Sequence, residues 1–291
     1  MSDRNEADGY IKAAKELVGK TGFLSKLFGS SDNAYKAVEL FQKAGNWYTV
    51  AKMWKDGGDA YLEAAKISES ILSNNYGAME NYSKAANCYR KEAPLDSVKY
   101  YQMVIKQCID LGSHSIAAKN SAVCAEVYEN ELQDIPKSIE FYQKAADLYL
   151  DDGSPANANK YLLKVAERCA IQREYAKAID IYEKVGKYSI GNDLLKYAAK
   201  DYFFKASLVA LAYDVLEAQK AICGYCEASN YFKTSGQCTL VKKILQSVED
   251  EDSTIFDDAI KEYLSVNQMD EWTQTMITRI RESIGQSFDI T

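Results

Sequence analysis

One eight-residue pattern recurs in register along most of the chain and limits the folds that the chain can adopt. The pattern runs small-apolar-x-x-aromatic-x-x-small. Its copies are AVELFQKA from Ala37, AMENYSKA from Ala78, SVKYYQMV from Ser97, SIEFYQKA from Ser138, AIDIYEKV from Ala178 and AICGYCEA from Ala221. They begin 41, 19, 41, 40 and 43 residues apart. Such a period is typical of solenoids, and a half-period near 20 fits one helix of about 14–16 residues plus a turn. The pattern therefore predicts stacked helical hairpins.

The spacing within the pattern explains its residue types. Positions 1, 2, 5 and 8 lie on one face of a helix, where small residues let neighbouring backbones approach and the aromatic ring fills the remaining gap. The expected core aromatics are Phe41, Tyr82, Tyr101, Tyr142, Tyr182 and Tyr225. A tyrosine in such a position packs its ring and turns its hydroxyl toward an edge. Packing therefore accounts for most of the 22 tyrosines better than an aromatic cofactor site does.

Composition favours the same fold class. Only 3 prolines and 15 glycines occur in 291 residues, too few for the turns of an all-β protein. Between the pattern copies lie further helix-like segments from Ala60, Ser115, Asn157 and Leu194, and the three prolines (Pro94, Pro136, Pro155) fall at turns or first helical turns. We expect an all-α, tetratricopeptide-like solenoid of antiparallel helical hairpins that form a twisted sheet with a concave and a convex surface.

The repeat fades near residue 240, which predicts two domains. Residues 1–240 are expected to form the solenoid, and residues 241–291 a C-terminal helical bundle and tail. In MDEWTQTMITRIRESI, four apolar residues step by four along one helix face: Trp272, Met276, Ile280 and Ile284. That helix must therefore dock on an apolar surface.

The sequence offers no pattern that favours catalysis. The single histidine, His114, cannot build a histidine cluster, and no glycine-rich loop is present to cradle phosphates. Cys223 and Cys226 form a C-x-x-C, but no preceding strand or second pair accompanies them, so packing is the favoured reading. We expect no catalytic residue, metal or cofactor. A net charge of −7 disfavours nucleic acid as a partner, and the polar N-terminus with seven scattered cysteines favours a cytoplasmic protein with reduced thiols.

A solenoid does not explain the segment GFLSKLFGSS at residues 22–31. Phe23, Leu24, Leu27 and Phe28 stand there in a glycine- and serine-bounded loop, although loops are normally polar. They either pack onto the first repeat or enter a bilayer. Insertion of all four would release roughly 6–12 kcal/mol before ordering costs, at about 1.5–3 kcal/mol for each side chain.

A set of lysines on the intervening helices is the second unexplained feature: Lys119, Lys160, Lys164, Lys196 and Lys200. Two pairs are spaced by four residues, so each pair forms a local basic ridge on a helix. If equivalent helices align, the ridges form a basic stripe on one face. The alternative is scattered solubilising charge.

These segments resemble the soluble NSF attachment proteins, most closely the alpha/beta type, over essentially the whole chain. GFLSKLFGSS is similar to the family's membrane-attachment loop. LGSHSIAAKN, NANKYLLKVA, KAIDIYEKVG and LLKYAAKDYFFKA resemble its most characteristic stretches, and MDEWTQTMITRIRESI its C-terminal helix. The resemblance implies an adaptor without catalytic activity, monomeric in solution, of which several copies wrap a four-helix bundle of syntaxin-like and related SNAREs. These copies present their C-termini to the hexameric AAA ATPase NSF, which disassembles the bundle after membrane fusion.

The resemblance also implies roles for individual residues. The five lysines match SNARE-contacting positions, and the four apolar loop residues match the membrane-binding loop, which implies peripheral attachment to vesicle, Golgi, endosomal or plasma membranes. The positions that match ATPase contacts are Asp214, Glu249, Asp250, Glu251, Asp252, Asp289 and Ile290.

The chain departs from the family pattern at three places. Ser113 and Gly236 stand where family members carry arginines, which implies a thinner basic stripe. The tail has only Asp289 before Ile290, whereas family tails carry a run of acids, so the strength of ATPase stimulation is left open.

Three other readings share part of these features. A generic tetratricopeptide-like scaffold that binds a peptide would have the same period but would not require an exposed apolar loop. An enzyme that itself uses ATP, and the gamma subtype of the same family, are less consistent with the stretches quoted above.

Overall fold

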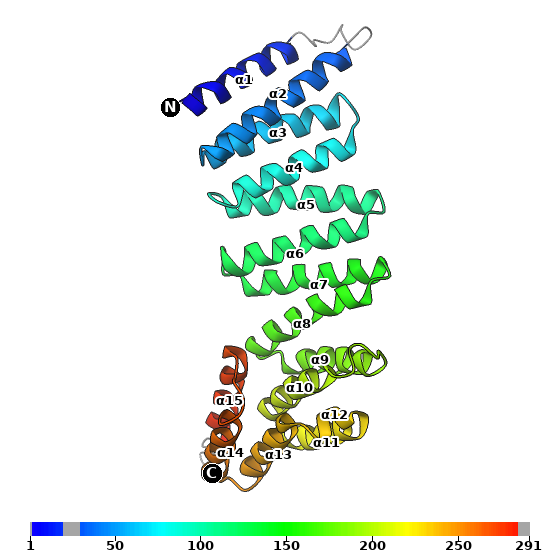
Figure 1. The fold of residues 1–291 in the computed structure, drawn as a ribbon, viewed down its shortest axis with the longest axis vertical. Helices are drawn as coiled ribbons and strands as arrows, with labels where there is room; N and C mark the ends of the chain where they lie inside the picture. The colour runs from blue at the N-terminus through cyan, green and yellow to red at the C-terminus, as the bar shows by residue number, and fades with distance from the viewer. Residues whose placement is uncertain (1, 20–29, 285–291) are drawn as a thin grey trace. The chain divides into compact units, whose positions relative to one another are not determined.

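The computed structural model describes residues 2–19 and 30–284, and every regular element in those ranges is a helix (Figure 1). The expected all-α array of helical hairpins is confirmed. The helices pack into two compact units, of which unit 1 runs to Ala158 and unit 2 begins at Asn159. The boundary that we expect near residue 240 falls inside unit 2, within a single helix, and stays a prediction about where the repeat ends.

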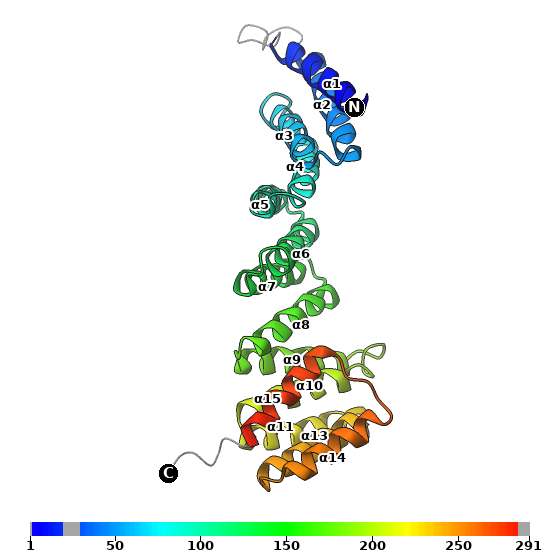
Figure 2. The ribbon, with the colours of Figure 1, turned by 90° about the vertical axis from the view of Figure 1, so that its left-hand side faces the viewer.

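Unit 1 is a stack in which each helix packs on the next helix of the chain (Figures 1 and 2). Its helices are α1 (Ser2–Gly19), α2 (Ser30–Val50), α3 (Trp54–Ser70), α4 (Asn75–Tyr89), α5 (Pro94–Asp110), α6 (His114–Asn130) and α7 (Ile135–Asp151). Prolines stand in the first turns of α5 and α7, as expected, and Asp134 caps α7 by accepting from the backbone N–H of Lys137 at 3.0 Å.

The turn after α5 shows how the chain reverses within so few residues. Gly112 takes a φ of +68°, and the backbone N–H of Ser113 donates to the carbonyl of Cys108 at 2.8 Å. This is a Schellman arrangement, in which a residue with positive φ satisfies carbonyls at the helix end. Gly153 repeats the geometry with φ +69° after α7. Glycine adopts this conformation without a steric cost, which explains its place at both turns.

The six core aromatics expected from the repeat are all buried, which confirms the packing interpretation. Several of their hydroxyls also donate to an earlier helix: Tyr82 to Glu69 at 2.8 Å, and Tyr101 to Asn87 at 2.7 Å. Burial, together with the hydrogen bond to Glu69, raises the pKa of Tyr82 above its ordinary value, so that hydroxyl stays protonated and continues to donate. The tyrosines therefore join successive helices by both packing and a polar bond.

Unit 2 is arranged around α10, which packs against α9, α11, α12, α13 and α15. Its helices are α8 (Pro155–Ile171), whose first turn lies at the unit boundary, α9 (Tyr175–Ile190), α10 (Ala199–Tyr213), α11 (Val215–Ala228), α12 (Asn230–Lys233), α13 (Gly236–Glu249), α14 (Ser253–Leu264) and α15 (Glu271–Ile284). Phe203 of α10 is fully buried and stacks on Tyr225 of α11 with ring centroids 4.8 Å apart.

The expected helix start at Leu194 is wrong, because residues 191–198 form turns and α10 begins at Ala199. The side-chain Oδ1 of Asn192 accepts from the backbone N–H of Leu194 at 3.0 Å. Its backbone carbonyl accepts from the backbone N–H of Lys196 at 2.9 Å. Asparagine side chains that bond the backbone in this way compete with helix formation. Lys196 and Lys200 are therefore not one ridge on a single helix.

Helix α15 docks by the apolar stripe expected for it, since Trp272, Met276, Ile280 and Ile284 are all buried. Polar contacts to α8 fix its position. The indole N–H of Trp272 donates to the carbonyl of Glu167 at 3.2 Å. The guanidinium of Arg279 donates to the carbonyls of Ala170 at 2.8 Å and Ile171 at 2.9 Å. Arg279 thereby adds a partner to two carbonyls in the last turn of α8, of which that of Ala170 also accepts from the backbone N–H of Arg173 at 3.1 Å.

Candidate binding surfaces

Four of the five candidate SNARE-binding lysines lie in unit 2, and two of these are already paired with nearby acids. The Lys196 ammonium lies 2.9 Å from an Asp193 carboxylate oxygen, and that hydrogen bond is the main cause of the raised pKa of Lys196. Lys164 lies 4.0 Å from Glu167. Exposed pairs of this kind contribute little to stability, so an acidic partner can take the place of the local acid at low cost.

The other two candidate lysines of unit 2, Lys160 and Lys200, have no ion-pair partner among the described residues. Lys160 is exposed on α8, where its ammonium lies 5.4 Å from the centroid of the neighbouring Tyr161 ring. Lys200 is half-buried in the first turn of α10. These two cations therefore add to the positive charge that unit 2 presents to a ligand.

The fifth lysine, Lys119, is exposed on α6 of unit 1 and likewise has no ion-pair partner in the part of the chain that the structure describes. Two turns before it on the chain, Ser113 is the N-cap residue of α6, although its side chain makes no capping hydrogen bond. A continuous stripe would have to run from unit 1 to unit 2, and it stays a prediction.

Sequence reasoning missed Lys205, a lysine that holds unit 2 together. Its ammonium lies 2.7 Å from Glu167, 3.9 Å from Asp270 and 4.8 Å from the centroid of the Trp272 ring. Burial opposes ionisation of Asp270, but hydrogen bonds from Thr273 and the charge of Lys205 hold the pKa of that carboxyl below its ordinary value. Lys205 thus links α8, α10 and the start of α15.

Two of the candidate ATPase-binding acids have structural partners of their own. Asp214 is the N-cap of α11 and accepts from the backbone N–H of Glu217 at 2.9 Å. Asp252 is the N-cap of α14, where it accepts from the hydroxyl of Thr254 at 2.6 Å and from its N–H at 2.8 Å. These bonds, the hydroxyl bond first, lower the pKa of Asp252. Substituting either aspartate would therefore disturb a helix start as well as any ligand contact.

The acids between these caps are better placed for a partner. Glu249, Asp250 and Glu251 are exposed in the turn from α13 to α14, and Glu251 has a φ of +53°. None of the three takes part in an ion pair among the described residues. They therefore form a compact negative segment, which we call the acidic turn, that forms no salt bridge with any residue that the structure describes.

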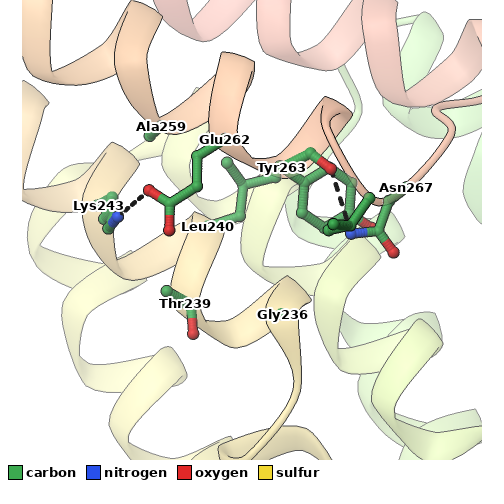
Figure 3. Close-up of a pocket in the computed structure, with 9 residues that line it drawn as sticks. Gly236, Thr239, Leu240, Lys243, Ala259, Glu262, Tyr263 and Asn267 are labelled. Carbon is green, nitrogen blue, oxygen red and sulfur yellow. Dashed lines mark hydrogen bonds and ion pairs between the residues drawn. The ribbon is translucent and has the colours of Figure 1, made fainter.

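A small hollow of about 180 Å³ lies between α13 and α14 (Figure 3). Gly236 and Leu240 line it from one side and Tyr263 from the other, and Lys243 is paired with Glu262 at its edge. An arginine at position 236, as the resemblance places in other family members, would reach into this space or across its rim.

Six candidate residues lie outside the described residues: Phe23, Leu24, Leu27 and Phe28 of the apolar loop, and Asp289 and Ile290 of the tail. Their assignments stay predictions. Within residues 2–19 and 30–284, no group of three or more His, Cys, Asp or Glu side chains is placed to hold a metal ion. No helix in those ranges combines the length and the apolar character that crossing a membrane requires.

Comparison with known proteins adds a result that the geometry alone cannot give. The family model for soluble NSF attachment protein, SNAP, matches residues 5–285. The chain belongs to the soluble NSF attachment protein family. It is 38% identical to the bovine beta-soluble NSF attachment protein over 97% of this chain and 94% of the relative. Identity to the human alpha-soluble NSF attachment protein is also 38%, over 94% of this chain and 92% of the relative.

One fungal relative is named for vesicular fusion. The chain is 34% identical, over 90% of each protein, to a "Probable vesicular-fusion protein sec17 homolog" of Neurospora crassa. The resemblance to the alpha/beta type of SNAP is thereby confirmed, and it extends through both units.

Proposed function

We propose that this SNAP-family chain is an adaptor that binds assembled SNARE complexes and recruits and stimulates the ATPase NSF, so that the complexes are disassembled in vesicle fusion and intracellular membrane traffic. The observation that carries the proposal is the family match over residues 5–285, together with relatives named as NSF attachment proteins that the alignments cover over 94% and 92% of their length. ATP hydrolysis in this scheme belongs to NSF, and the adaptor supplies binding surfaces only.

The charges of unit 2 fit a division of this work between two surfaces. Lysines on α8 and at the start of α10 supply positive charge for an acidic SNARE bundle, and the acidic turn between α13 and α14 supplies negative charge for a basic surface of NSF. Complementary charge of this kind speeds encounter and orients the partner more than it raises affinity. Binding to SNAREs should therefore weaken as ionic strength rises.

Membrane association would come from the apolar residues of segment 22–31, whose last two residues begin α2, rather than from a spanning helix. Full insertion of its four apolar side chains would release roughly 6–12 kcal/mol before ordering costs. Because ordering costs reduce this gain, we expect the attachment to be reversible. We infer a peripheral protein, monomeric in solution, that meets vesicle, Golgi, endosomal or plasma membranes where SNARE complexes assemble, with several copies on each bundle.

A pull-down with purified components tests the proposal. The chain is incubated with a soluble, assembled SNARE bundle, with and without NSF and a non-hydrolysable nucleotide. We expect the chain to bind the bundle and NSF to be retained only when chain and bundle are both present. Retention of single SNARE peptides without NSF would instead support the generic tetratricopeptide-like scaffold.

A further inference from the structure

Two cysteines from different helices of unit 2 lie in sulfur-to-sulfur contact. The Sγ atoms of Cys226, near the end of α11, and Cys238, in the first turn of α13, are 3.4 Å apart. A disulfide requires about 2.05 Å between the sulfurs and a Cα separation of roughly 4.4–6.8 Å. The helices α11 and α13 do pack on each other. To form a disulfide, the two sulfurs must therefore approach each other by about a further 1.4 Å.

The two thiols differ in how they meet solvent. Cys226 is partly exposed, whereas Cys238 is 1% exposed. Burial, and then the contact with Cys226, raise the pKa of the Cys238 thiol to about 11. Against this, Cys238 is the third residue of α13, its N–H donates to the Ser235 hydroxyl at 3.1 Å, and a helix start favours a thiolate. The accessible sulfur thus reacts first, and the buried one lies directly behind it.

A third cysteine serves as a built-in comparison. Cys223 is exposed and lies one helical turn before Cys226 on α11. No sulfur contact of Cys223 occurs among the described residues. It can react with an external oxidant, and the cysteine nearest to it in the sequence is Cys226, three residues later. Because Cys223 is the more exposed of the two, a greater tendency of Cys226 to form a disulfide reports the neighbour and not the exposure.

We propose that Cys226 and Cys238 form a site of reversible oxidation. A low-molecular-weight disulfide of the glutathione class acts as the oxidant, and the resulting Cys226–Cys238 disulfide joins α11 to α13. The Cys226 thiolate attacks one sulfur of the oxidant, which forms a mixed disulfide and releases one glutathione thiolate. The Cys238 thiolate then attacks the Cys226 sulfur and releases the second. Two protein thiols are oxidised, one oxidant is reduced to two thiols, and the two thiol protons pass to the released thiolates. This site is independent of the adaptor role.

The bond would close a loop that carries α12. Residues 226–238 contain the Ser229 cap of α12 and the buried Phe232, whose ring meets those of Phe203 and Tyr225 at centroid distances of 6.0 and 6.2 Å. Oxidation would tether both ends of this segment to the packed centre of unit 2. The amides of α12 should then exchange with solvent more slowly, and a reductant should reverse the effect.

Tryptic mapping tests the proposal, because Lys233 lies between the two cysteines. The folded full-length chain is incubated with oxidised glutathione, and the remaining accessible thiols are then blocked with an alkylating agent. Because Cys124 is buried, its lack of modification shows that the chain is still folded at this step. The chain is then digested. We expect the peptides of residues 221–233 and 234–242 to be joined by a bond that reductant cleaves. Cys223→Ser should keep that joined product. Cys238→Ser should instead leave Cys226 as a mixed disulfide with glutathione.

Two results would overturn the assignment. One is the absence of joined peptides in Cys223→Ser at an oxidant ratio that glutathionylates Cys223 in the unaltered chain. The other is a joined product of equal yield in Cys226→Ser, which would assign the reaction to Cys223. Cys226→Ala provides a second variant at the same position, and circular dichroism before oxidation shows that each variant is folded.

Discussion

Replacement of Arg279 by glutamine is the sharpest test of how unit 2 is built. The side chain donates two hydrogen bonds, at 2.8 and 2.9 Å, to the carbonyls of Ala170 and Ile171 at the end of α8. A hydrogen bond from a charged donor contributes roughly 1.5–3 kcal/mol. Because Arg279 is half-buried and the freed carbonyls regain some water, we expect a loss of about 2–3 kcal/mol in the free energy of unfolding of unit 2.

Arg281 provides a matched control two residues further along the same helix. Its guanidinium lies 2.8 Å from Asp257 in an exposed pair, and such pairs contribute about 0–1 kcal/mol. Arg281→Gln should therefore lower the free energy of unfolding by less than about 1 kcal/mol. Arg279→Lys should fall between the two glutamine variants, because one ammonium cannot reproduce the planar fork that reaches both carbonyls.

Urea unfolding followed by tryptophan fluorescence measures these differences, and hydrogen exchange locates them. We expect the amides of α15 to lose protection in Arg279→Gln and to keep it in Arg281→Gln. Equal losses in the two glutamine variants, or a loss below about 0.5 kcal/mol for Arg279→Gln, would refute the reasoning that the bonds to α8 hold the helix in place.

Three further predictions concern the proposed surfaces. Phe23→Ser with Phe28→Ser should reduce liposome-assisted disassembly of SNARE complexes but leave binding to a soluble bundle unchanged; loss of soluble binding would place these side chains in the core. Lys119→Glu with Lys160→Glu should weaken SNARE binding at low salt with little change in melting temperature, whereas an unchanged affinity would remove both lysines from the interface. Ile290→Ala should permit assembly with NSF and slow disassembly in a turnover assay; an unaltered rate would show that the tail residue has no such role.

Local periodicity explains why so much of the fold could be predicted. Each core aromatic, such as Tyr82 or Tyr101, lies at a fixed position among small residues of its own helix. Eight residues of sequence are therefore enough to predict its burial. The docking face of α15 is visible for the same reason, since Trp272 and Met276 are four residues apart. The start of α10 could not be predicted because a single side chain, that of Asn192, competes with the helix.

The polar contacts of unit 2 are harder to predict, because their partners are distant in sequence. Arg279 meets carbonyls that lie 108 and 109 residues earlier, and Lys205 meets Glu167 38 residues earlier. One signal was available for Arg279: it stands seven residues after Trp272, which puts it beside the buried stripe of α15. The candidate lysines combine both cases. The spacing of Lys160 and Lys164 on one helix was predictable, whereas Glu167, which lies near Lys164, also pairs with the distant Lys205.

The stacking of unit 1, in which each helix rests on the next and a tyrosine hydroxyl often bridges the junction, has a mechanical consequence. In such an array the free energy is close to a sum over adjacent junctions. A load applied along the stack is then shared among the junctions between helices. Small rotations at successive junctions add up, while each core aromatic ring stays packed against its neighbours. Unit 1 should therefore behave as a soft spring, whose compliance grows with the number of helices and whose deformation costs little at any one of them.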